Sequence, residues 1–163
     1  MTHSLTTAPM IPPEVEAELK RLRQTVTNGE TAITNAEAER THLTDEVADL
    51  AAVMNENRAT AAIPEPQAAD FAELGKWHTA VRDWRAGRSG LDEAHAQLET
   101  ERNRKAGEAI PAVAQKISGL RFEIAQHEFD AAKIDNVVAQ QHAKQTAERV
   151  DHYQRALWSA RQA

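Results

Sequence analysis

Apolar residues recur at alternating steps of four and three between residues 15 and 54. Ten of the twelve positions in this series are apolar, and Gly29 and Arg40 are the exceptions. A period of 3.5 residues places one narrow apolar stripe along a helix, and such a stripe packs against another helix. The pattern therefore predicts a long helix over residues 13–60 that pairs with a second helix.

The start of this helix has a clear chemical signature. Residues 1–12 are predicted to form a flexible N-terminal arm, because they contain little to bury. Pro13 is tolerated in a first helical turn, and the glutamates that follow suit the positive end of the helix dipole. Asn28-Gly29 favours a turn, but the heptad phase continues across it. We therefore expect the helix to continue, with Gly29 marking a close helix crossing.

A proline-rich linker is predicted at residues 61–68, where Pro64 and Pro66 exclude continuous helix. A second heptad series predicts a helix over residues 69–106. Two glycines interrupt this series at 87–90. A break or kink there and a straight helix both fit the pattern.

A third series predicts a long helix over residues 110–161. A glycine, a proline and a change of phase separate it from the second helix. They indicate either a turn between two helices or a kink in one very long helix. The pattern slips once more near residues 138–143.

The predicted fold class is all-α. The long helices could form an antiparallel coiled coil or a three-helix bundle, and an elongated, oligomeric arrangement also satisfies the stripes. The sequence does not decide whether the stripes pair within one chain or between chains. The predicted helix-packing seam contains Leu19, Leu22, Val26, Ile33, Leu43, Val47, Leu50, Met54, Leu74, Val81, Leu91, Leu98, Ile117, Leu120, Ile124, Ile134 and Val138.

Composition narrows the class of protein. The chain has no cysteine, which excludes disulfides, thiolate metal sites and cysteine nucleophiles. No stretch reaches the apolar length needed to span a bilayer, and the first residues do not resemble a signal peptide. We therefore expect a protein located in the cytoplasm, or within a particle assembled there.

The net charge of −6 lies entirely in the first segment. Residues 1–69 hold 5 basic and 11 acidic side chains, and the rest of the chain is balanced. Phosphate binding favours a basic stripe, so the sequence argues against nucleic acid as a partner. We expect most of these acidic side chains to form a solvated helix face. Alternatively, the acidic helix docks onto a basic partner.

The sequence contains no complete motif for catalysis or for binding a metal or cofactor. His127 and Glu128 begin like the zinc-protease helix, but Ala131 stands where the second histidine must be. Glu39 and His42 have the spacing used in di-metal bundles, but they flank the stripe and do not lie on it. The sequence predicts no catalytic residue, no metal site and no cofactor.

Aromatic residues offer the strongest candidates for contact with a partner. Trp77 and Trp84 are seven residues apart, hence on one helix face, and they belong either to an internal core or to a docking surface. Tyr153 and Trp158 could serve as anchors near the C-terminal end.

Two functional hypotheses follow. The first is a non-enzymatic coiled-coil assembly protein, serving as scaffold, spacer or oligomerisation module in a larger complex such as a phage or other particle. The alternative is a helical adaptor, chaperone or inhibitor of one protein partner. The expected partner is protein, either a second copy of the chain or a larger assembly.

Overall fold

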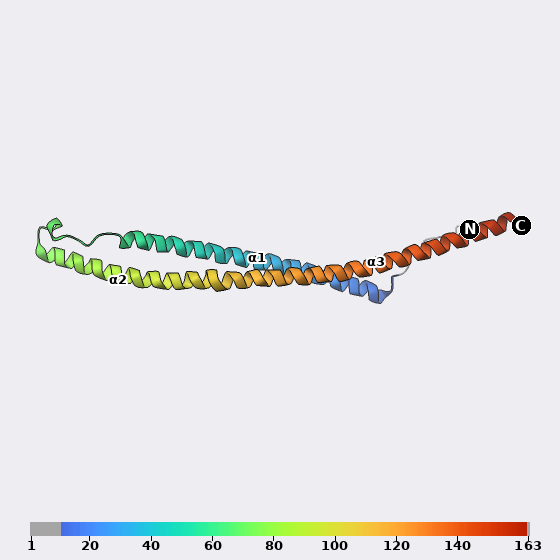
Figure 1. Ribbon diagram of the computed structural model, residues 1–163, viewed down its shortest axis with the longest axis horizontal. Coiled ribbons are helices and arrows are strands. Elements are labelled where there is room, and N and C mark those ends of the chain that lie inside the picture. Colours follow the sequence, from blue (N-terminus) through green and yellow to red (C-terminus); the bar gives the residue numbers. More distant parts are fainter. Residues whose placement is uncertain (1–10, 163) are drawn as a thin grey trace. The chain divides into compact units, whose positions relative to one another are not determined.

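The computed structural model describes residues 11–162, and these are helical apart from short connections. No strand occurs within that range, which confirms the predicted all-α class. The elements follow in the order α1 (Pro13–Ala61), the 3₁₀ turn η1 (Ala68–Asp70), α2 (Leu74–Arg104), the π-helical turn η2 (Lys105–Ala109) and α3 (Ile110–Gln162). Figure 1 labels the three α-helices. Of the predicted arm at 1–12, residues 1–10 lie outside the described residues.

α1 begins where Pro12 supplies its carbonyl to the first turn. The backbone N–H groups of Val15 and Glu16 donate to that oxygen at 3.0 and 3.1 Å. The acidic side chains of Glu14 and Glu16 lie in this first turn, next to the positive end of the helix dipole. The helix then continues for 49 residues without a break at Asn28-Gly29.

The connection after α1 is longer than the linker predicted at 61–68. α1 includes Ala61, and α2 starts at Leu74 and not at residue 69. The intervening residues hold a single 3₁₀ turn at 68–70, closed by a bond from the Phe71 N–H to the Ala68 carbonyl. Pro64 and Pro66 lack N–H donors and stop α1 from continuing. The connection between α1 and α2 therefore spans residues 62–73.

The break considered at 87–90 does not occur, because α2 is one helix of 31 residues that includes both glycines. No described glycine has a positive φ, so neither Gly87 nor Gly90 forms a turn. Each glycine lowers helix propensity by about 1 kcal/mol. That cost is small enough for the helical residues on both sides to override it.

The predicted boundary at 106–111 is a widened helical turn and not a reversal. η2 follows α2 directly, and the Ile110 N–H donates to the Lys105 carbonyl, five residues earlier. Pro111 has no N–H, and its ring would clash with the carbonyl four residues before it. A π turn relieves that clash by spacing the backbone more widely. The chain therefore stays helical from Leu74 to Gln162, and this long helical stretch packs with α1.

The described residues group into two compact units. The first contains residues 11–33 and 119–162, and the second contains residues 34–118. In the first unit Leu19 and Leu22 of α1 are buried. The buried apolar residues of the second unit are Ala36, Met54, Val81, Val113 and Ile117.

Candidate interaction surfaces

Most of the residues predicted for the packing seam are shielded from solvent. Leu74 is different: its side chain is 67% exposed at the first residue of α2, where the packed part of that helix has not yet begun. Five members are buried, namely Leu19, Leu22, Met54, Val81 and Ile117; the half-buried members are Val26, Ile33, Leu43, Val47, Leu50, Leu91, Leu98, Leu120, Ile124, Ile134 and Val138.

Two ion pairs link α1 to later helical residues within the second unit. Glu46 of α1 pairs with Lys105, and Glu39 pairs with Lys116. The α1 residue that comes earlier in the sequence therefore pairs with the partner residue that comes later. In the first unit, Arg23 of α1 contacts Asp135 of α3 at 3.2 Å.

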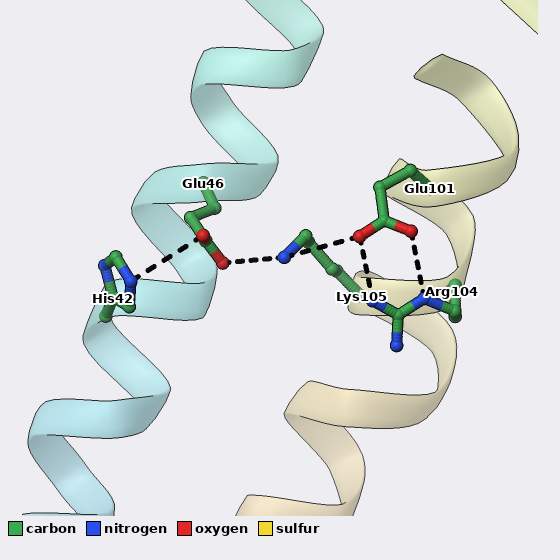
Figure 2. A network of polar contacts seen from close by, with 5 residues as sticks. All are labelled: His42, Glu46, Glu101, Arg104 and Lys105. Atoms are coloured by element: carbon green, nitrogen blue, oxygen red, sulfur yellow. Dashed lines mark hydrogen bonds and ion pairs between the residues drawn. The ribbon is translucent and has the colours of Figure 1, made fainter. Parts of the chain in front are cut away.

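A cluster of polar contacts in the second unit is centred on Lys105, at the start of the π turn (Figure 2). Its ammonium group lies 2.8 Å from Glu46 Oε2 and 3.4 Å from Glu101 Oε1, and its side chain is 16% exposed. Arg104 donates to both carboxylate oxygens of Glu101, and His42 lies 3.6 Å from Glu46. One lysine thereby joins carboxylates from two helices.

These contacts lower the pKa values of the two carboxylates. The hydrogen bond from Arg104 is the largest cause of the lowered pKa of Glu101, which falls from 4.5 to about 2. The hydrogen bond from Lys105 lowers the pKa of Glu46. Glu46 and Glu101 in turn raise the pKa of Lys105, and the hydrogen bond to Glu46 is the largest cause. Both carboxylates are therefore ionised at neutral pH and hold the lysine between them.

Gly29 is a point of close approach in the first unit. A Cβ added there would lie 2.8 Å from Cγ1 and 3.0 Å from Cδ1 of Ile124 on α3. Real Cβ atoms are not found so close to a neighbour, so a side chain at residue 29 requires a shift. The close helix crossing predicted at Gly29 is confirmed.

Trp77 and Trp84 face the chain's own connection. Trp77 Nε1 donates to the Pro66 carbonyl and Trp84 Nε1 donates to the Ile63 carbonyl, each at 2.9 Å. Arg85 adds an ion pair to Glu65 at 2.9 Å. Both indoles are half-buried. They hold residues 63–66 against α2. The N–H groups of both indoles are therefore already hydrogen-bonded within the chain.

The C-terminal end of α3 has a different character. Every residue from Ala143 to Gln162 is exposed. We call residues 143–162 the C-terminal segment of α3. Its large apolar side chains are 45–64% exposed. Three of them follow at steps of three and four and so share one helix face. The four exposed side chains are Val150, Tyr153, Leu157 and Trp158.

An open groove adjoins this segment in the first unit. It has a volume of about 680 Å³ and lies between the beginning of α1 and the middle of α3. Val15 and Leu22 line it from α1, and Ile134 and Val137 line it from α3. Nδ1 of His127, also at the groove, is buried with no hydrogen-bond partner among the described residues. We call this feature the α1/α3 groove.

Two exposed aromatic residues of α3 were not among the predicted partner anchors. Phe122 is 72% exposed and Phe129 is 62% exposed, and Lys133 lies 6.0 Å from the ring of Phe129. They are seven residues apart and lie outside the predicted seam. That spacing of two off-seam aromatics is the signal that would have identified them.

Within residues 11–162, no group of three or more histidine or acidic side chains is placed to hold a metal ion. In that range no helix combines the length and apolar character required to cross a membrane. Comparison with known proteins gives no match to a family model, to a curated protein or to a solved structure.

Proposed function

We propose that this protein is a non-enzymatic assembly protein, whose α1 and following helices form an antiparallel coiled coil that presents a docking helix to a larger complex. The observation that carries the proposal is the exposure of the C-terminal segment of α3. Four large apolar side chains lie there on a helix with no covering neighbour among the described residues. Clustered aromatic and aliphatic side chains are typical anchors of protein interfaces.

The antiparallel arrangement is supported by the order of the contacts between helices. Partner numbers run in opposite senses at Glu39 and Glu46 in the second unit. A half-buried lysine between two carboxylates fixes the register of that pairing, since a shift of one residue would separate the charges. A coiled coil with fixed register is suited to serve as a spacer or scaffold.

The adaptor hypothesis that used Trp77 and Trp84 has weaker support. Their indole N–H groups bond to the carbonyls of Pro66 and Ile63 in the same chain. A docking surface built from these tryptophans would have to break those bonds or use the remaining ring edges. The C-terminal segment of α3 needs no such rearrangement.

The test measures the size of the complex that contains the protein in the cells that make it. We expect the native protein to elute at a mass well above one chain, and Leu157→Asp to shift it to the mass of one chain. Ser159→Asp is the matched control, because it adds the same charge on the opposite side of the helix. If the native protein and Leu157→Asp both elute as one chain, the proposed function is wrong.

A further inference from the structure

We infer that the C-terminal segment of α3 docks into the α1/α3 groove of a second copy of this chain, so that two copies exchange their segments reciprocally. This inference rests on the proposed function, because it names the partner of the docking helix proposed there.

Position brings the two features together on one helix. The groove is lined by Pro12 of the chain just before α1 and by Gln141 of α3, so the start of α1 lies beside residue 141. From residue 142 onward α3 continues for 21 residues, about 30 Å, beyond that point. Groove and segment are therefore consecutive lengths of α3. Two copies related by a two-fold axis near the junction would place each segment along the groove of the other.

The interface would continue one that already exists. Ile134 and Val138 lie on the face of α3 that α1 partly covers, and both also line the groove. A helix added to the groove would contact α1 and α3 together. Most of the stability of a helix in a protein comes from packing of its apolar face, so docking would also stabilise the segment itself.

The exposed area is large enough for a specific contact. Trp158 is 64% exposed and Tyr153 is 45% exposed, and such side chains bury roughly 150–250 Å² each when covered. With Leu157 and Val150, one segment offers on the order of 400 Å² of apolar surface. Two segments and the two groove walls that they cover amount to on the order of 1,600 Å², the standard size of a specific interface.

Charge fits the same occupant. The segment carries four basic and two acidic side chains, a net charge of +2. The groove is lined by three acidic and two basic side chains, a net charge of −1.

The experiment measures the mass of the purified full-length chain by light scattering and its dimer dissociation constant by sedimentation. We expect a dimer for the native chain. Leu157→Asp in the segment and Val137→Asp in the groove should each weaken dimerisation about tenfold or more. Val137 is 53% exposed, so a charge there does not enter a packed core. Ser159→Asp and Asn136→Asp add the same charge on the outer side of α3 and should leave the dimer intact.

Mixing the two weakened variants gives the decisive result. A Leu157→Asp chain has an intact groove and a Val137→Asp chain has an intact segment, so the mixture regains one of the two contacts. We expect heterodimers in the mixture at concentrations where neither variant dimerises alone. A monomeric native chain, an unaffected Val137→Asp dimer, or a mixture without heterodimers at any attainable concentration would each overturn the inference. A purified monomer whose complex in cells still depends on Leu157 would overturn it while leaving the proposed function standing.

Discussion

Substitution of Gly29 by alanine should destabilise the protein, although alanine is the better helix former. The substitution gains about 1 kcal/mol of helix propensity. The new Cβ would lie 2.8 Å from Cγ1 of Ile124, and this carbon is held near the backbone and cannot swing away freely. Overpacking of this kind typically costs about 1–3 kcal/mol. We therefore expect a net loss of up to about 2 kcal/mol in the free energy of unfolding, or a few degrees in melting temperature.

The sign should reverse when the obstructing atoms are removed. In an Ile124→Ala background, Cγ1 and Cδ1 are absent, so Gly29→Ala should stabilise the protein by about 1 kcal/mol. Gly119→Ala is the matched control, because a Cβ at Gly119 meets nothing within 4 Å and should give the same gain in the native background. Urea unfolding followed by circular dichroism measures the native chain, the three single variants and the double variant. Equal stabilisation by Gly29→Ala and Gly119→Ala in the native background would refute the close crossing.

Three further predictions concern the second unit. Trp84→Phe removes the hydrogen bond to the Ile63 carbonyl and should cost about 1 kcal/mol, with faster hydrogen exchange in the connection before α2; unchanged exchange would count against the clamp. Glu101 has its pKa lowered from 4.5 to about 2, chiefly by the hydrogen bond from Arg104, so its stabilising contribution is present above pH 4.5 and is lost as the pH falls toward 2. Glu101→Gln should therefore flatten the fall in melting temperature across that range, and an identical pH profile would contradict the assignment. Gly90→Ala should stabilise the protein by about 1 kcal/mol, whereas a loss of stability would indicate a turn in α2.

The heptad pattern predicted the all-helical class because a sustained 3.5-residue period keeps one apolar stripe of a helix facing a partner helix. It also singled out Gly29 as a crossing point, because a glycine within an unbroken apolar stripe lets two helices approach closely. The ends of the connection after α1 were less well predicted. Prolines show where a helix stops, but α2 starts after Glu73 without a side-chain cap that the sequence could have revealed.

The turn at 105–109 shows why local signals failed. A glycine and Pro111 together suggested a turn or kink, and a π turn accommodates the same proline while the chain remains helical. The cluster at Lys105 was also missed, because it depends on the register between helices that are far apart in sequence. The α1/α3 groove could not be predicted for a similar reason, since it is a gap between side chains and leaves no periodic signal.

Chemical cross-linking tests the central claim, the pairing of α1 with α3 of the same chain, most directly. The chain has no cysteine, so Arg23→Cys with Asp135→Cys gives one unique pair at a site where the native side chains are 3.2 Å apart. Arg23→Cys with Ser159→Cys is the control, because residue 159 lies about 36 Å further along α3. With a short bis-maleimide and a mixture of isotopically labelled and unlabelled chains, the account predicts a link within single chains for the first pair and no such link for the control. Links that join labelled to unlabelled chains alone, or no link between residues 23 and 135, would contradict it.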